Sequence, residues 1–284
     1  MPTTRRPAAH PENPITVRET PPGVQGPARE LWFEREGTRL FALEAGRGHP
    51  VVFIHGGLAD HRAAMFRVGG LAAAHRLLAP DLRGSGRSVY AGALSWDALA
   101  DDVVALLDHL ELDRAVIGGT SMGSGVAIRF ALRHRSRATG LILMSPVYPG
   151  ADRPLPAAAS SAMRVMAEAG EQVLTRGVEA LRPLFEGLPA PIRDVALQMM
   201  LEFDAASVHA TTRFLASSTQ PLSSARDLAS IEASVALLPG TDPQHPPEIA
   251  ELYGRHLRAP FLVDPAAPGH VQRLIEFCAE VGAP

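Results

Sequence analysis

Short apolar runs alternate with longer stretches of helical periodicity along most of this chain, and this alternation limits the folds that it can adopt. Four runs have the length and composition of strands buried on both faces, at residues 51–54, 77–79, 115–117 and 141–144. Strands that alternate with helices form βαβ units, whose right-handed crossovers place helices on both faces of a sheet. The sequence therefore predicts an α/β fold with a mostly parallel central sheet, and functional residues at the carboxyl ends of its strands.

The remaining predicted elements extend this pattern toward both ends of the chain. Ser95 is a candidate N-cap for a helix, because an acidic first turn and apolar residues at helical spacing follow it. The other predicted strands are 31–33, 40–43, 235–238 and 261–263, and the other predicted helices are 61–74, 122–134, one from about residue 246 and one after His270.

The alternation stops over a segment of helix-like pieces punctuated by prolines, which is far longer than an ordinary connection. Seven prolines near the N-terminus exclude a regular helix or a central strand there. We therefore predict four parts: a Pro-rich tail (1–30), the first part of an α/β core (31–149), a helical cap insertion (150–228) and the second part of the core (229–284).

Composition excludes several classes of function. The 27 basic residues are all arginine and are balanced by 30 acidic residues, so the charge does not favour a nucleic-acid partner. Without lysine the chain has no Schiff-base, Ser–Lys or P-loop chemistry. Its single cysteine, Cys278, excludes an intrachain disulfide and a Cys-rich zinc site.

No apolar stretch reaches the ~18 residues of a spanning helix, and no apolar signal region follows Arg5 and Arg6. We expect a cytoplasmic protein with a small-molecule substrate and no membrane partner.

The motif at residues 119–123, Gly-Thr-Ser-Met-Gly, matches the G-x-S-x-G pattern of a nucleophile elbow. It follows a predicted buried strand and precedes a predicted helix, as such an elbow requires. Glycines on both sides of Ser121 leave room in a sharp turn where a Cβ atom would clash. The alternative is a plain strand-to-helix turn with a capping serine. We interpret Ser121 as the nucleophile.

A serine nucleophile that attacks a carbonyl needs two backbone N–H groups aimed at the developing oxyanion. One comes from the residue after the nucleophile, Met122. The other is expected from the loop His55-Gly56-Gly57, directly after the 51–54 strand, and Gly57 is the candidate. The alternative is an ordinary βα turn with a buried His55.

Three motifs resemble, in their order along the chain, those of the α/β-hydrolase-fold superfamily, in particular its capped serine hydrolases. They are residues 55–57, the segment 80–88 with the sequence Pro-Asp-Leu-Arg-Gly-Ser-Gly-Arg-Ser, and residues 119–123. The resemblance covers residue 31 to the C-terminus apart from the cap. It implies that 80–88 is a structural loop beside the site, and the lack of lysine argues against a phosphate-binding loop there.

The resemblance also implies the other two members of a catalytic triad, because the family order is serine, then acid, then a histidine near the C-terminus. His270 fits the histidine, after the 261–263 strand. Asp242 fits the acid after the 235–238 strand, although the family more often has Gly-x-x-Asp where this chain has Gly-Thr-Asp. Asp264 and Asp152 are alternative acids. His245 is interpreted as a bystander at the start of the next helix.

The cap sequence carries apolar side chains suited to a binding pocket, namely Met163, Met166, Phe185, Met199, Met200, Phe203 and Phe214. Each of them could instead pack the helices of the cap itself. As a group they suggest a small, mainly apolar substrate.

The sequence predicts a serine hydrolase of an ester, thioester or lactone, with Ser121, His270 and Asp242 as the triad and no cofactor or metal. An aspartate nucleophile, as in a dehalogenase or epoxide hydrolase, is excluded by Ser121. Alternatives on the same fold are a C–C bond hydrolase, a cofactor-free perhydrolase, a biosynthetic acyltransferase or cyclase, and a ligand-binding receptor with slow turnover.

Overall fold

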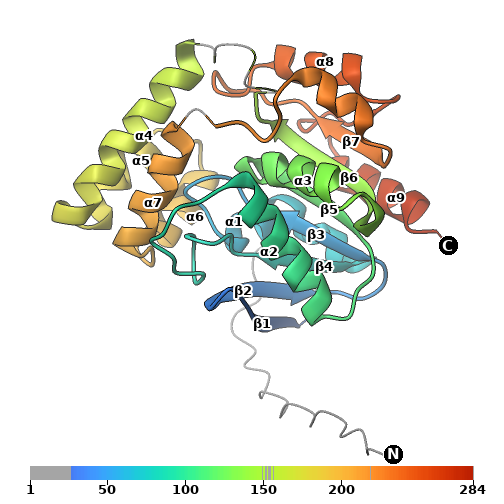
Figure 1. Cartoon of the computed structure of the whole chain (residues 1–284), viewed down its shortest axis with the longest axis horizontal. Coiled ribbons are helices and arrows are strands. Elements are labelled where there is room, and N and C mark those ends of the chain that lie inside the picture. Colours follow the sequence, from blue (N-terminus) through green and yellow to red (C-terminus); the bar gives the residue numbers. More distant parts are fainter. Residues whose placement is uncertain are drawn as a thin grey trace, which may run out of the picture.

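An eight-stranded sheet forms the centre of the computed structural model, which describes residues 27–148, 150, 152, 155, 157–217 and 219–283 (Figure 1). The strand order is β1-β2-β4-β3-β5-β6-β7-β8. β2 pairs antiparallel with β1 and β4, whereas all pairs from β4 to β8 are parallel. The strands are β1 Ala28–Arg35, β2 Thr38–Ala45, β3 Pro50–Ile54, β4 Arg76–Pro80, β5 Ala115–Ser121, β6 Ala138–Pro146, β7 Ser234–Leu238 and β8 Phe261–Leu262. The predicted mostly parallel α/β sheet is confirmed.

Helices cover both faces of this sheet, and a second group of helices lies to one side of it (Figure 1). α2, α3 and α8 share one apolar cluster with the sheet, and α1 and α9 share another. The α-helices are α1 His61–Val68, α2 Trp96–His109, α3 Met122–Arg133, α4 Ala157–Arg176, α5 Arg182–Glu186, α6 Ile192–Met200, α7 Ala205–Ala216, α8 Pro247–His256 and α9 His270–Val281. The predicted N-cap is confirmed, since the Ser95 side chain accepts a hydrogen bond from the Ala98 amide.

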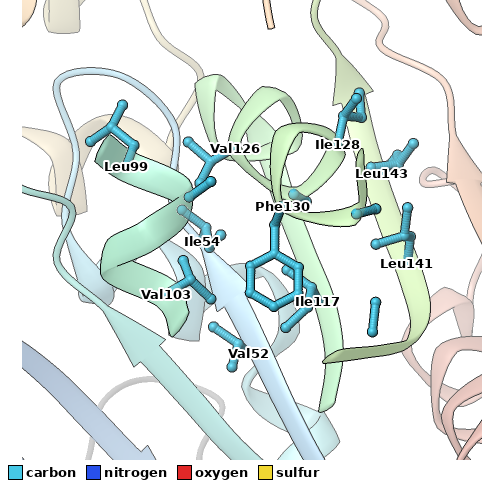
Figure 2. Packing of buried hydrophobic residues seen from close by; sticks show 14 of the residues in the cluster. Val52, Ile54, Leu99, Val103, Ile117, Val126, Ile128, Phe130, Leu141 and Leu143 are labelled. Atoms are coloured by element: carbon cyan, nitrogen blue, oxygen red, sulfur yellow. The ribbon is translucent and has the colours of Figure 1, made fainter. Parts of the chain in front are cut away.

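Alternate side chains of β3 point into opposite layers of the core. Val52 and Ile54 pack with α2 and α3, while Val51 and Phe53 pack on the side of α1 and α9, and all four are fully buried. In Figure 2 the ring of Phe130 from α3 lies over the strands near Val52. A strand that is buried on both faces reads as a continuous apolar run because it has no side exposed to water.

The bounds of several elements differ from the prediction, and the differences at β1 and α1 are described here. β1 begins at Ala28, within the segment predicted as a tail, and pairs with β2 along its whole length. The predicted helix 61–74 is divided into α1 and a 3₁₀ helix at Gly69–Ala73. This 3₁₀ helix packs closely against α9, since a Cβ atom on Gly70 would lie 2.9 Å from Val271 Cγ1. Residues 1–26 of the predicted tail lie outside the described residues.

Helices α4 to α7, which we call the helical insertion, occupy the chain between β6 and β7. They have an apolar core of their own, which includes Val173, Leu181 and Met200. Side chains of α7 attach the insertion to the core: Thr211 Oγ1 donates to the Gly84 carbonyl at 2.9 Å, and Ser207 Oγ accepts from the Tyr90 amide at 3.0 Å. The predicted domain boundaries themselves stay predictions.

Among the described helices, none combines the length and the apolar character that crossing a membrane requires. The cytoplasmic location stays a prediction.

Replacing Phe130 with alanine should lower the free energy of unfolding by about 3–5 kcal/mol, because the ring is fully buried between α3 and the sheet and its loss leaves a cavity. Chemical denaturation measures this change. The control is Leu201→Ala, whose side chain is 60% exposed and whose loss should change stability by at most about 0.5 kcal/mol. Equal effects of the two substitutions would contradict the packing described here.

Candidate active site

The turn from β5 into α3 holds Ser121 in a backbone conformation that residues other than glycine rarely adopt, with φ 51° and ψ −121°. Two glycines make this turn possible. A Cβ atom on Gly119 would overlap the Gly123 backbone, and a Cβ atom on Gly123 would overlap the carbonyl of Ile54 at the end of β3. The predicted elbow geometry is therefore present, with Ser121 at the carboxyl end of the central strand.

Ser121 is the first member of a hydrogen-bonded relay that passes through His245 to Asp242. The Ser121 Oγ atom lies 2.8 Å from His245 Nε2. The other ring nitrogen, Nδ1, lies 3.0 Å from each carboxylate oxygen of Asp242. A carboxylate only accepts hydrogen bonds, so Nδ1 carries the proton and Nε2 is free to accept the proton of the serine hydroxyl.

The loop after β7 is folded so that His245 turns back over Asp242. The carboxylate of Asp242 accepts hydrogen bonds from the amides of Gln244 and His245, at 2.8 and 3.0 Å. The His245 amide also lies 3.0 Å from the Asp242 carbonyl. Gly240 permits this fold, because a Cβ atom there would overlap the backbone and Cβ of His245.

The surroundings of Asp242 favour its ionised form. The hydrogen bond from His245 lowers the pKa of Asp242 below its ordinary value, with further contributions from the charge of His245 and from the two amides, against an opposing effect of burial. The side chain of Asp242 is 52% exposed, whereas that of His245 is 16% exposed. The acid therefore remains charged at neutral pH and can hold the imidazole in place.

The structure brings Ser121 and Asp242 together as predicted but places a different histidine between them. His270 is the first residue of α9, and among the described residues no hydrogen bond joins its ring to Ser121 or Asp242. The position expected for His270 is taken by His245, which the sequence analysis interpreted as a bystander. The prediction was wrong because it took the histidine from the loop after the last strand, whereas the loop after β7 folds back on itself and supplies its own.

The two alternative acids are engaged elsewhere. Asp264 Oδ1 accepts from the Ala266 amide, and Asp152 Oδ2 accepts from Ser224 Oγ. Neither has a hydrogen bond to His245 or His270. The Asp-x-x-His spacing could have identified His245 from the sequence, since an aspartate that caps a tight turn brings the side chain three residues later back toward its own carboxylate.

Both predicted oxyanion-hole residues lie beside Ser121. Met122 is the first residue of α3, where backbone N–H groups are free and the helix dipole favours negative charge. Gly57 lines the same cavity as Ser121 and Met122. A Cβ atom on Gly57 would lie 2.8 Å from Leu215 Cδ1 of α7, so the absence of a side chain lets the helical insertion cover this loop closely.

His55 is fully buried and anchors the loop that carries Gly57. Its Nδ1 atom lies 2.6 Å from the Gly56 carbonyl, and its Nε2 atom accepts from the Leu82 amide at 3.0 Å. Burial lowers the pKa of His55, so the ring is neutral and can accept at Nε2. His55 therefore joins the 55–57 loop to the 80–88 segment.

A cavity at Ser121 extends between the core and the helical insertion. It encloses about 780 Å³ of space, part of which is open to solvent. Its described lining residues are Gly57, Trp96, Ser121, Met122, Val147, Tyr148, Leu155, Ala159, Met163, Met166, Leu215, Thr219, Gln220, Gln244 and His245. Apart from His245, this described lining holds no acidic or basic side chain. Of the predicted pocket residues of the cap, Met163 and Met166 reach the cavity, whereas Phe185, Met199 and Met200 belong to the core of the insertion.

One group of described residues, Asp60, His61 and Asp81, has the spacing of a metal site. Its ligand atoms already have partners. Both oxygens of Asp60 accept from Arg62, Asp81 Oδ1 accepts from the His61 amide and lies 2.8 Å from His61 Nδ1, and Asp81 Oδ2 accepts from the Arg87 amide. This donor set favours a structural role, in which buried charges pair to hold the 80–88 segment against α1.

The sequence and the fold were compared with those of known proteins. The model of the Alpha/beta hydrolase family matches residues 51–279. The chain belongs to the alpha/beta hydrolase family. Among curated relatives it is 36% identical over 118 residues to the AB hydrolase superfamily protein YisY of Bacillus subtilis, which is 40% of this chain and 44% of that protein. It is 34% identical over 116 residues to a 2-hydroxymuconate semialdehyde hydrolase of Pseudomonas sp., which is 38% of this chain and 40% of that protein. The matches thus span less than half of these relatives.

Solved structures of this hydrolase family resemble the whole described fold. A thermophilic esterase from Thermogutta terrifontis superposes with a TM-score of 0.71 at 26% identity, over 90% of this chain and 100% of the other. Est816, described as an N-acyl homoserine lactone degrading enzyme, superposes with a TM-score of 0.64 at 25% identity, over 88% and 98% of the two chains.

Replacing His245 with alanine should slow the reaction of Ser121 with a fluorophosphonate probe by at least about 100-fold, because the hydroxyl loses its base. Intact-mass measurement over time gives the rate. His270→Ala is the matched control and should react at about the wild-type rate. The reverse result, with His270→Ala slowed and His245→Ala unaffected, would contradict the relay described here.

The buried pair of His61 and Asp81 should make stability depend on pH. Burial alone disfavours a charged His61, but the charge and hydrogen bond of Asp81 together raise the pKa of His61 above 6.5. The stabilisation is complete below that value and is lost as pH rises through the raised pKa. His61→Gln should therefore lower the free energy of unfolding more at about pH 5.5 than at about pH 9.

Denaturant titrations of wild type and variant at both pH values measure this difference. His209→Gln is the control, because His209 pairs with Glu171 at the surface, where solvent screens the interaction. A loss for His61→Gln that does not change with pH would show that folding does not raise the pKa of His61, and a loss that is larger at about pH 9 would show that the ring is uncharged in the folded protein.

Proposed function

We propose that this protein is a serine hydrolase that cleaves an ester, thioester or lactone of a small, mainly apolar substrate through an acyl-enzyme. The observation that carries the proposal is the relay of Ser121, His245 and Asp242, with both hydrogen bonds of the relay at about 3 Å or less. This arrangement matches a nucleophile with its base and the group that orients the base.

In the first half of the proposed reaction, Ser121 Oγ attacks the substrate carbonyl and His245 Nε2 takes the hydroxyl proton. The amides of Met122 and Gly57 hold the oxygen that becomes negative. As the tetrahedral intermediate collapses, His245 gives its proton to the leaving alcohol, thiol or ring oxygen. The negative charge of Asp242 stabilises the imidazolium between these two transfers.

In the second half, water attacks the acyl group on Ser121. His245 removes a proton from this water and returns it to Ser121 Oγ as the bond breaks. The balance is one ester and one water consumed, and one acid and one alcohol released. No cofactor enters either half, and every proton is moved by a single imidazole.

The described lining of the cavity supports an apolar, uncharged substrate. Met163, Met166 and Ala159 of α4 supply an apolar wall on one side of Ser121, and Leu215 of α7 covers the loop of Gly57. Thr219, Gln220 and Gln244 supply neutral hydrogen-bonding groups. An ionised group placed among these side chains would lose its hydration without gaining a counter-charge.

The similar structures support the same reaction class. The Thermogutta protein is an esterase, and Est816 is described as an N-acyl homoserine lactone degrading enzyme. The Pseudomonas relative is a 2-hydroxymuconate semialdehyde hydrolase. Its name is the reason to test a C–C bond substrate beside the esters.

The decisive assay compares p-nitrophenyl esters, a lactone and a β-diketone with wild type and Ser121→Ala. The proposal expects ester and lactone turnover that is lost in Ser121→Ala. Preferred cleavage of the β-diketone would support C–C hydrolysis. Product that forms only when an alcohol or amine acceptor is added would support acyl transfer, and saturable binding without turnover would support a receptor.

Enlarging the side chain at Met163 should shorten the acyl chain that the enzyme accepts. In Met163→Trp, the ratio of kcat/KM for p-nitrophenyl octanoate to that for the acetate should fall at least about tenfold, because the ring fills space that a long chain needs. Val165→Trp, on the same helix but with its native side chain 41% exposed, is the matched control. An equal change for both substrates would show that Met163 does not contact the acyl chain.

A further inference from the structure

The hydroxyl of Ser124 lies between two backbone groups at the base of the elbow. It donates to the Ser121 carbonyl at 2.6 Å and accepts from the Val147 amide at 3.2 Å. Ser124 is fully buried in the first turn of α3. Serines in helices often donate to a carbonyl three or four residues earlier, which is the ordinary reading of the first of these bonds.

The hydrogen bond from the Val147 amide determines where the Ser124 hydroxyl points its own proton. The Val147 N–H is a donor, so it occupies a lone pair of Ser124 Oγ and leaves the single hydroxyl proton for the Ser121 carbonyl. Val147 is itself held in place from α8, because the buried hydroxyl of Tyr253 donates to the Val147 carbonyl at 2.8 Å. A chain of hydrogen bonds therefore runs from Tyr253 through Val147 and Ser124 to the backbone of Ser121.

The Ser121 carbonyl belongs to the same peptide group as the Met122 N–H. A peptide group is planar, so a bond that fixes its oxygen also fixes the direction of its N–H. A hydrogen bond to the carbonyl also polarises the peptide and strengthens the N–H as a donor. Ser121 has a positive φ at the start of α3, and the bond from Ser124 is one that holds its carbonyl in this sharp turn.

We propose that Ser124 is a positioning residue for the oxyanion hole: its hydroxyl, held by Val147 and Tyr253, sets the direction and strength of the Met122 N–H. This inference rests on the proposed function, because it assigns Ser124 a role in the acyl transfer of Ser121. The effect is confined to the transition state, where the negative oxygen forms, and substrate binding is unaffected.

The test compares an ester with the matching thionoester, in which sulfur replaces the carbonyl oxygen. Sulfur is larger and accepts hydrogen bonds poorly, so a well-placed N–H favours the oxygen ester. In Ser124→Ala, kcat for the oxygen ester should fall about tenfold with KM nearly unchanged, since loss of a whole oxyanion donor costs about 10²–10³. The ratio of oxygen-ester to thionoester kcat/KM should fall by a similar factor.

Ser88→Ala is the matched control. Ser88 is also fully buried, and its hydroxyl also bridges two backbone groups, donating to the Asp81 carbonyl at 2.8 Å and accepting from the Phe41 amide at 2.9 Å. Its loss should leave the ester ratio unchanged. Ser124→Thr keeps the hydroxyl and should restore most of the ratio. If Ser124→Ala does not fold, Tyr253→Phe, which removes only a hydroxyl, should lower the ratio in the same direction by a smaller factor.

The inference is wrong if folded Ser124→Ala has the wild-type ratio of oxygen-ester to thionoester kcat/KM. If the alanine variant does not fold, the same result in folded Tyr253→Phe overturns it. Either result leaves the proposed function standing. An equal loss for both esters also overturns it, because a general distortion of the site affects both. If wild type hydrolyses neither ester and forms no fluorophosphonate adduct, the proposed function itself fails, and the inference fails with it.

Discussion

The close passage of α3 past the end of β3 determines the geometry of the site. Gly123 meets the Ile54 carbonyl with no room for a side chain, and Gly119 meets Gly123 in the same way. This contact bends the chain sharply enough to place Ser121 at a positive φ, with its side chain clear of both elements. A conformation of this kind costs free energy and persists because the surrounding packing enforces it. Here the buried layers on both faces of β3 and β5 supply that packing.

The rest of the site is assembled around this bend by loops at the carboxyl ends of neighbouring strands. The loop after β3 carries Gly57, and the loop after β7 carries Asp242 and His245. The helical insertion is bonded to the core through α7 rather than lying loosely over it. Its α4 contributes the apolar wall of the cavity. The core thus carries Ser121, Asp242 and His245, and α4 and α7 of the helical insertion add Ala159, Met163, Met166 and Leu215 to the wall of the cavity.

The fold could be predicted from the sequence because burial on both faces leaves a continuous apolar run, as at residues 51–54, and because Ser121 lies in a motif with strict steric demands. Asp242 was also singled out from the sequence, because it lies in the loop after a predicted strand, and the structure places it beside His245. The contact of His245 with Ser121 was not predicted. The direction of a histidine in a loop depends on backbone hydrogen bonds, here those from the His245 amide to Asp242, and no apolar pattern in the sequence reveals them. The 3₁₀ helix after α1 was also missed, and the close contact of its Gly70 with Val271 of α9 joins residues that lie far apart in the chain and that no local pattern connects.

In the structure His245, and not His270, lies between Ser121 and Asp242. Proton NMR of the imidazole N–H groups tests it directly, because a proton held between a ring nitrogen and a carboxylate resonates at unusually low field. We expect a low-field resonance in wild type that is lost in His245→Gln and in Asp242→Asn but retained in His270→Gln. The buried pair of His61 and Asp81 should give a separate resonance, which His61→Gln identifies. A low-field resonance that survives in His245→Gln and disappears in His270→Gln would contradict this position of His245.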